Sequence, residues 1–168
     1  MSGPQRDSIV LLFKNLVFTL VVPGTIAVYV PFLIARNRSP ASGPVFVIAL
    51  AVLTVGAAVY AWCVWDFAAV GRATPAPIDA PKKLVVRGLY RYTRNPMYVG
   101  VLTVILGWAL FFEAPALVLY AVLVGICCHL FILLYEERHL RRKFGAEYDA
   151  YCAQVGRWLP RLRRRPAG

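Results

Sequence analysis

Apolar residues fall into four long blocks along the chain, separated by short polar or basic segments. The blocks cover residues 9–35, 45–70, 97–112 and 115–135. At a helical rise of about 1.5 Å per residue, the first block reaches roughly 40 Å, enough to cross a bilayer with tilt. The third reaches only about 24 Å, so its helix stands nearly upright or ends short of the far surface. The pattern predicts an all-α fold, a polytopic membrane bundle of about four transmembrane helices.

Short interruptions within and between the blocks indicate how these helices are arranged. Only Glu113 and Ala114 separate the third block from the fourth. So short a link forces an antiparallel helical hairpin over residues 97–135. Pro23 and Pro31 interrupt the first block and should kink its helix, because proline removes a backbone hydrogen bond.

The last part of the chain, residues 136–168, is basic and carries a regular apolar pattern. Its apolar residues recur at spacings of four, three, four and three, at Phe144, Tyr148, Tyr151, Val155 and Trp158. These spacings place them on one face of a C-terminal amphipathic helix. Such a helix lies in the plane of the lipid headgroups or folds back over the cytoplasmic end of the bundle.

Composition excludes several classes of protein. Of the 168 residues, 60% are hydrophobic and only 16% are charged, and the mean hydropathy is +0.61. These values exclude a soluble globular domain, a disordered chain and a collagen-like chain. The four cysteines show no C-x-x-C spacing, so neither a disulfide framework nor a metal site is expected. Motifs for soluble-type dinucleotide binding and metalloprotease chemistry are also absent from the sequence.

The chain has a net charge of +11, and the distribution of this charge indicates both a partner and an orientation in the membrane. The basic residues lie between and after the apolar blocks, so anionic lipid headgroups are the expected partner of the tail, and nucleic acid is not. The positive-inside rule places both termini and the connection 71–96 on the cytoplasmic face of an integral membrane protein. We therefore divide the chain into two N-terminal transmembrane helices, 1–70, and a region 71–168 holding this connection, the hairpin and the tail.

The densest polar and aromatic stretch, RGLYRYTRNPMY, covers residues 87–98 and leads directly into the third block. Pro96 suits the first turn of a helix, and Asn95 before it can cap the free amides of that turn. A capped helix start with interfacial Arg and Tyr side chains therefore explains the stretch. An anion site explains it equally well, because a helix N-terminus beside arginines binds carboxylates or phosphates.

Two adjacent carboxylates, Glu136 and Glu137, close the fourth block. Acidic groups at a membrane boundary carry a desolvation cost and need a compensating interaction. One explanation is a cation bound between the hairpin and the tail. The other is an interfacial pair neutralised by the neighbouring residues Arg138, Arg141 and Arg142.

Two further polar side chains lie within the apolar blocks. His129 precedes Glu136 by two helical turns and shares its face, so it is either a hydrogen-bonded structural residue or a catalyst. Asp66 lies one turn from the cytoplasmic end of the second block. An acidic residue inside a membrane is a functional candidate, but a position so near the edge favours an ion pair with an arginine of the following connection.

Two motifs flank the apolar hairpin in a fixed order: PKKLVVRGLYRYTRNPMYVG before it and EERHLRRKFGAEYDAYCAQVGRWLP after it. Together they resemble the integral membrane methyltransferases of the isoprenylcysteine carboxyl methyltransferase and phospholipid methyltransferase group. The resemblance covers residues 71–160, whereas residues 1–70 match only as generic spans. Either motif alone is weak, but their order around one hairpin makes the combination specific.

The resemblance implies that S-adenosyl-L-methionine is held at the cytoplasmic end of the bundle. The positions that match the family's cofactor-binding segments are Lys82, Lys83, Leu84, Val85, Tyr90, Arg94, Asn95, Pro96, Met97, Tyr98 and Glu136. These residue types suit a zwitterionic amino acid with a sulfonium. Such a ligand needs donors for its carboxylate, acceptors for its ammonium and hydroxyls, and aromatic faces near its cation.

The implied reaction is methyl transfer to a membrane lipid or a lipidated small molecule. A carboxylate acceptor needs no base, whereas an amine acceptor must lose a proton, which His129 or Glu137 would receive as catalytic residues. The sequence departs from the family at two places. Asn95 stands where the family has histidine, and residues 129–135 lack the arginine that meets the substrate in the carboxyl methyltransferases, which weakens the case for a prenylcysteine carboxylate.

Two other classes of function remain open at this point. One is a non-catalytic membrane scaffold or solute-handling bundle, which is what an enzyme that has lost the family histidine would become. The other is an NADPH-dependent membrane reductase, because sterol reductases share a related C-terminal bundle. Those reductases are longer chains with more spans. Affinity for S-adenosylhomocysteine rather than NADPH would separate the two enzymatic alternatives.

Overall fold

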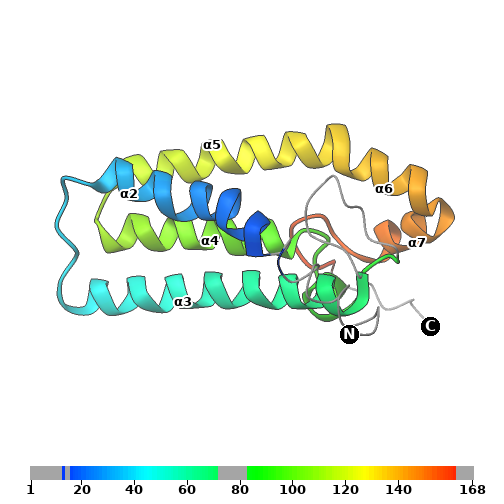
Figure 1. The fold of residues 1–168 in the computed structure, drawn as a ribbon, viewed down its shortest axis with the longest axis horizontal. Helices are drawn as coiled ribbons and strands as arrows, with labels where there is room; N and C mark the ends of the chain where they lie inside the picture. Colours follow the sequence, from blue (N-terminus) through cyan, green and yellow to red (C-terminus); the bar gives the residue numbers. More distant parts are fainter. Residues whose placement is uncertain (1–12, 14–15, 72–82, 162–168) are drawn as a thin grey trace, which may run out of the picture.

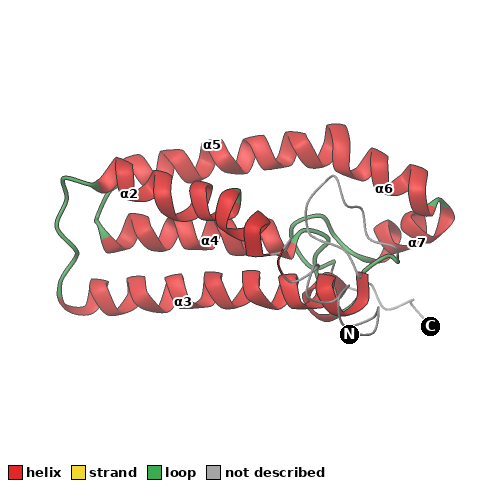
Figure 2. Cartoon of the chain, in the orientation of Figure 1, coloured by secondary structure: helices red, strands yellow, loops and turns green. Residues whose placement is uncertain are grey.

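The computed structural model describes residue 13 and residues 16–71 and 83–161. In this part of the chain every regular element is a helix (Figure 2), which confirms the predicted all-α class. In chain order the elements are η1 (Thr25–Tyr29), α2 (Val30–Ala35), α3 (Gly43–Asp66), η2 (Phe67–Gly71), η3 (Gly88–Arg91), α4 (Pro96–Phe111), α5 (Pro115–Phe131), η4 (Ile132–Glu136), α6 (Glu137–Phe144) and α7 (Ala146–Gln154).

The helices have the lengths that a membrane bundle needs. Among the described residues, three helical runs are long and apolar enough to span a bilayer, namely Leu16–Ala35, Gly43–Ala69 and Pro115–Phe144. The fourth, α4, has 16 residues and is shorter, as the third apolar block predicted. Within the first run the π-helical turn η1 lies between Pro23 and Pro31. The helical ladder is therefore distorted where the prolines predicted a kink.

Helix α4 is the centre of the bundle. It lies between α3 and α5, and α2 crosses one face of the layer that these three helices form (Figure 1). Packing of α4 against α3 is the most extensive contact between two helices. Glycine makes it possible, because a Cβ added to Gly56 of α3 would lie only 2.8 Å from the backbone nitrogen of Val104 in α4. Small residues allow such close approach of membrane helices.

The predicted antiparallel hairpin is formed by α4 and α5. Its turn is closed by a hydrogen bond from the Ala114 amide to the Ala109 carbonyl, 2.9 Å long, and Arg38 Nη1 donates to the Glu113 carbonyl across 2.9 Å. At the other end of the bundle, α5 continues through η4 into α6, and the chain reverses into α7 (Figure 1). We call this second end, where α6 and α7 lie, the tail end.

The single amphipathic helix predicted for the tail is wrong in one respect. Gly145 adopts a φ of +53° and ends α6, so the chain restarts as α7 and leaves the helical conformation at Val155. Trp158 therefore lies beyond the helix rather than on its apolar face. The aromatic part of that face is nevertheless buried, because Tyr148, Tyr151 and Val155 pack in one cluster with Leu84. The tail thus folds back over the end of the bundle, the second of its two predicted placements.

Helix α3, from the first predicted region, packs against α4, from the second, so one bundle contains both. The proposed division at residue 70 and the cytoplasmic orientation of the tail end stay predictions.

Candidate functional site

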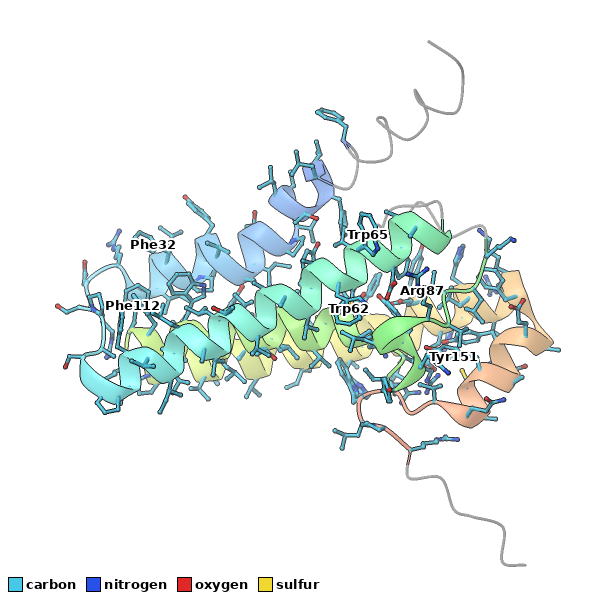
Figure 3. The ribbon with its side chains drawn as sticks, turned by 90° about the horizontal axis from the view of Figure 1, so that it is seen from below. Phe32, Trp62, Trp65, Arg87, Phe112 and Tyr151 are labelled. Atoms are coloured by element: carbon cyan, nitrogen blue, oxygen red, sulfur yellow. The ribbon has the colours of Figure 1, made fainter. Side chains whose placement is uncertain are left out.

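A cavity lies at the tail end of the bundle, between the connection before α4 and the two tail helices. Its empty volume, part of it open to solvent, is about 440 Å³. Of the residues labelled in Figure 3, Trp62, Trp65, Arg87 and Tyr151 lie toward this end, and Phe32 and Phe112 lie at the other. The lining residues are Phe67, Leu84, Val85, Tyr90, Arg94, Asn95, Ile132, Glu136, Glu137, Leu140, Tyr148 and Tyr151.

Tyr90 is held in the cavity wall by a short 3-10 turn, η3, that rests on the end of α3. Gly88 begins this turn with a φ of +55°, and a Cβ there would collide with Oδ2 of Asp66. Glycine is therefore required both by conformation and by space. Asp66 is 1% exposed and lies 3.2 Å from Arg87 Nε, which confirms the predicted ion pair with the connection. The Tyr90 ring packs on Phe67 with centroids 5.5 Å apart.

The tyrosines of the cavity are neutral hydrogen-bonding groups. The Tyr151 hydroxyl donates to the Tyr90 carbonyl across 2.7 Å and so joins α7 to the connection before α4. Burial raises the pKa of the Tyr90 hydroxyl well above its ordinary value, and burial raises the pKa of the Tyr151 hydroxyl as well. Both therefore keep their protons at physiological pH and present aromatic faces without a charge.

A buried charge cluster joins the connection, α6 and the tail. Glu137 is 9% exposed, and its Oε1 lies 3.1 Å from Arg94 Nη1. Arg157 engages the same carboxylate at both oxygens, with Nε 2.7 Å from Oε1 and Nη2 3.0 Å from Oε2. Of the two explanations that the sequence left open, neutralisation by arginines applies to Glu137, but the direct partners come from the connection and the tail and not from the next residues in the chain. A buried carboxylate needs such partners because desolvation penalises its charge.

Two polar atoms of the cavity residues bear on ligand binding. Arg94 donates from Nη1 to Cys152 Sγ across 2.8 Å, while its Nε is buried and has no hydrogen-bond partner within the described part of the chain. A buried donor without a partner is costly, so a ligand that satisfies it is favoured. On the other side, Glu136 accepts one hydrogen bond, 2.9 Å long, from the Tyr98 hydroxyl of α4.

The predicted helix cap at Asn95 has the right position but the wrong bond. Asn95 is the N-cap residue of α4 and Pro96 opens its first turn, yet the Asn95 side chain caps no amide of the helix. Its Nδ2 donates to the Arg157 carbonyl instead, across 3.1 Å. The tail lies beside the start of α4, and a carbonyl oxygen of the tail accepts this hydrogen bond. The sequence alone did not predict that the tail lies there.

His129 does not line the cavity, and its side chain is hydrogen-bonded to the tail. Its Nδ1 accepts a hydrogen bond from Trp158 Nε1, 3.0 Å long. The Nδ1 atom is therefore not available to accept a proton from a substrate as long as Trp158 stays in place. This contact is the hydrogen-bonded structural arrangement that was one of the two alternatives for this residue.

The structure brings most of the predicted site together. Seven predicted residues line the cavity: Leu84, Val85, Tyr90, Arg94, Asn95, Glu136 and Glu137. Lys83 is exposed, Met97 packs behind Tyr90, and Tyr98 reaches the cavity through Glu136. Lys82 lies outside the described residues.

Sequence reasoning missed five residues of the lining, namely Phe67, Ile132, Leu140, Tyr148 and Tyr151. The spacing of three between the two tyrosines marked them as buried, and that burial was the available signal. Phe67 and Ile132 belong to apolar runs in which no local pattern distinguishes a cavity wall from a lipid-facing or core position. Leu140 is a single apolar residue within a basic segment, and nothing in that segment marks it as part of a cavity.

Comparison with known proteins identifies the family of this chain. The family model described as phospholipid methyltransferase matches residues 44–147, which include all of α3 except its first residue, the connection, the hairpin and α6. The chain belongs to the phospholipid methyltransferase family. This confirms the resemblance found in the sequence, and with the apolar helices it makes the protein an integral membrane member of that family.

Two relatives of this family member share about a third of their aligned residues with it. A methanethiol S-methyltransferase of Pseudomonas deceptionensis is 33% identical over 81 residues, which are 46% of this chain and 29% of the relative. The match thus spans less than a third of that enzyme's length. An uncharacterized protein of Haemophilus influenzae is 33% identical over 63 residues, 38% of this chain and the whole of that relative.

Proposed function

We propose that this protein is an integral membrane methyltransferase that uses S-adenosylmethionine and acts on a lipid-like acceptor. Family membership supports the methyl transfer. The observation that carries the choice of cofactor is the buried, unpartnered Nε of Arg94 in the same cavity as the Glu136 carboxylate. One is a hydrogen-bond donor and the other an acceptor, and a zwitterionic amino acid needs both.

The residues present fit this cofactor. Arg94 Nε would bind its carboxylate, and Glu136 would accept from its ammonium or its ribose hydroxyls. Tyr90 and the neighbouring tyrosines of α7 would place aromatic faces near its positive charge. When bound, S-adenosylmethionine supplies an activated methyl group on a sulfonium. Of the other predicted binding residues, Leu84, Val85 and Asn95 would form the wall around it, and Tyr98 would hold Glu136 in place. The binding roles of Lys82, Lys83, Pro96 and Met97 stay predictions.

The chain's own residues would bind the cofactor and the acceptor, orient them toward each other and exclude water. Alignment alone contributes several kcal/mol to such a transfer. The catalytic roles predicted for His129 and Glu137 stay predictions, and each has a structural cost. His129 would have to give up Trp158, and Glu137 would have to leave two arginines. Glu136 is the less encumbered carboxylate of the cavity.

The acceptor we favour is a thiol or an amine on an apolar body, which would enter the cavity in its uncharged form. As its sulfur or nitrogen takes the methyl group, it would release a proton to a carboxylate of the cavity. The arginine that lines the cavity, Arg94, is paired with Glu137, and residues 129–135 contain no arginine. A carboxylate acceptor would therefore lack a protein cation of its own. The relative from Pseudomonas deceptionensis is described as acting on methanethiol, which is a thiol. We place the site on the cytoplasmic side, as the charge distribution predicts.

In the experiment the protein is placed in lipid nanodiscs, and radiolabelled S-adenosylmethionine is added with one of three acceptors. The acceptors have the same chain length and differ in the reacting group: dodecanethiol, dodecylamine and dodecanoate. We expect methyl transfer to the thiol or the amine at a rate at least about tenfold above that to the carboxylate, since an unpaired acceptor charge in the cavity is penalised. Faster transfer to dodecanoate would contradict the acceptor class. No transfer to any acceptor, by protein that also fails to bind S-adenosylhomocysteine, would contradict the proposed function itself.

A further inference from the structure

A second hollow lies at the end of the bundle opposite the tail end, along the turn that joins α4 to α5, and we call it the turn groove. Its empty volume, part of it open to the surroundings, is about 700 Å³. On α4, helical spacing places Leu106, Ala109 and Leu110 on one face, and Glu113 follows at the turn. The groove therefore runs along the helix axis for about 10 Å. Its lining residues are Leu106, Ala109, Leu110, Glu113, Ala114, Pro115 and Val118.

The walls of the turn groove are apolar and face outward from the bundle. Leu106, Leu110 and Val118 are exposed, whereas Ala109 and Ala114 are buried and pack toward α2. The two small side chains therefore form the floor between the larger ones. In an integral membrane protein an outward groove of this kind lies beside lipid, and the hydrocarbon core holds no water to fill it. An acyl chain has the shape and the polarity that the groove requires.

Two opposite charges lie at the mouth of the groove and do not pair with each other. Arg38 Nη1 donates to the backbone carbonyl of Glu113, so its guanidinium lies against the turn. The carboxylate of Glu113 instead lines the groove, and no described residue forms a hydrogen bond or an ion pair with it. Both side chains are exposed. The mouth therefore presents an anion and a cation side by side, each able to bind a group of opposite charge.

The short length of α4 raises the cost of this unpaired carboxylate. Its 16 residues span about 24 Å, less than the roughly 30 Å of the hydrocarbon core. The turn that follows is thus drawn toward the hydrocarbon boundary, or the bilayer thins around it. An acidic group at that depth needs a compensating interaction. Since no described residue supplies one, a cation from the surroundings is favoured at Glu113.

We propose that the turn groove binds a phospholipid whose headgroup carries an ammonium group. One acyl chain lies in the groove, the ammonium pairs with the carboxylate of Glu113, and the phosphate pairs with the remaining N–H groups of Arg38. The adjacent charges of the protein thus meet the adjacent charges of the lipid. This lipid is not the methyl acceptor, because the turn and the cofactor cavity lie at opposite ends of the bundle (Figure 1). The site is therefore independent of the proposed function.

The test is native mass spectrometry of the detergent-solubilised protein titrated with one of two lipids that have the same acyl chains. Phosphatidylethanolamine carries the ammonium group, and phosphatidylglycerol has the phosphate without it. Glu113→Gln removes the charge at the mouth, and Val118→Trp fills the groove. Val122→Trp is the matched control, because Val118 and Val122 lie one turn apart on α5 and are 46% and 53% exposed, but only Val118 lines the groove.

We expect the wild type to bind phosphatidylethanolamine about threefold or more tightly than phosphatidylglycerol, the value of one exposed ion pair. Glu113→Gln should abolish this preference. Val118→Trp should weaken phosphatidylethanolamine by about fivefold or more, because the acyl chain loses its contacts, whereas Val122→Trp should bind it as the wild type does.

Three results would overturn the inference. One is a preference for phosphatidylethanolamine that persists in Glu113→Gln, and another is equal binding of this lipid by Val118→Trp and Val122→Trp. The third is a wild-type dimer that Val118→Trp alone dissociates, because the groove would then be covered by a second copy of the chain.

Discussion

The Glu137→Gln variant is expected to lose about 3 kcal/mol of unfolding free energy, the cost of removing one partner from a buried ion pair. Glu137 compensates Arg94, whose side chain is 10% exposed, and Arg157, whose side chain is 30% exposed. Glutamine keeps the shape but leaves the buried guanidinium of Arg94 without a counter-charge. The three segments that meet at this carboxylate should then separate more readily.

The measurement is unfolding of the purified protein by titration with a denaturing detergent, followed by far-UV circular dichroism. Asp149→Asn is the matched control, because Asp149 pairs with Arg141 at 2.8 Å while both side chains are more than half exposed. Exposed pairs of this kind contribute about 0–1 kcal/mol. Equal losses in the two variants would contradict the special position of Glu137.

The Gly56→Ala variant is expected to destabilise the bundle by about 1–3 kcal/mol, the usual cost of overpacking a tight interface. The added methyl group would lie 2.8 Å from the Val104 backbone nitrogen and 3.0 Å from the Gly100 carbonyl oxygen. Backbone atoms cannot turn aside as a side chain can, so α3 and α4 would have to move apart. Because this is the most extensive helix contact, the loss should affect the entire bundle.

Gly125→Ala in α5 is the control for this change. A Cβ at Gly125 would lie 3.7 Å from a methyl group of Leu102, an ordinary van der Waals contact. Alanine also gains about 1 kcal/mol over glycine in helix propensity, so this variant should be neutral or stabilised. The same detergent titration gives both values. A Gly56→Ala variant as stable as Gly125→Ala would contradict the close packing of α3 and α4.

The sequence predicted those parts of the fold that depend on local pattern. Apolar length alone defines a membrane helix, so the spans and the short α4 were found, and the link at Glu113 and Ala114 was enough for the hairpin. The tail was predicted less well. The spacing of its apolar residues is helical throughout, but Gly145 adopts a left-handed conformation, and no periodicity reveals that a particular glycine will do so.

In the candidate site too, local sequence motifs were predicted correctly, whereas contacts that depend on tertiary structure were not. Tyr90, Arg94 and Glu136 were identified through a resemblance carried by two motifs, and the structure brings them to one cavity. The partners of Glu137 could not be read from the sequence, because Arg157 lies 20 residues away along the chain and reaches Glu137 only after Gly145 reverses the tail. The hydrogen bonds of Asn95 with Arg157 and of His129 with Trp158 have the same origin in tertiary structure.

The central claim is that the cavity at the tail end binds S-adenosylmethionine through Glu136. The most direct test is calorimetric titration of the solubilised protein with S-adenosylhomocysteine, for the wild type, Glu136→Gln and the control Glu147→Gln, an exposed carboxylate of α7. We expect wild-type affinity on the order of micromolar, an unchanged value for Glu147→Gln, and a loss of about tenfold or more for Glu136→Gln. Folded wild-type protein that does not bind, or a Glu136→Gln variant that binds as tightly as the wild type, would contradict the claim.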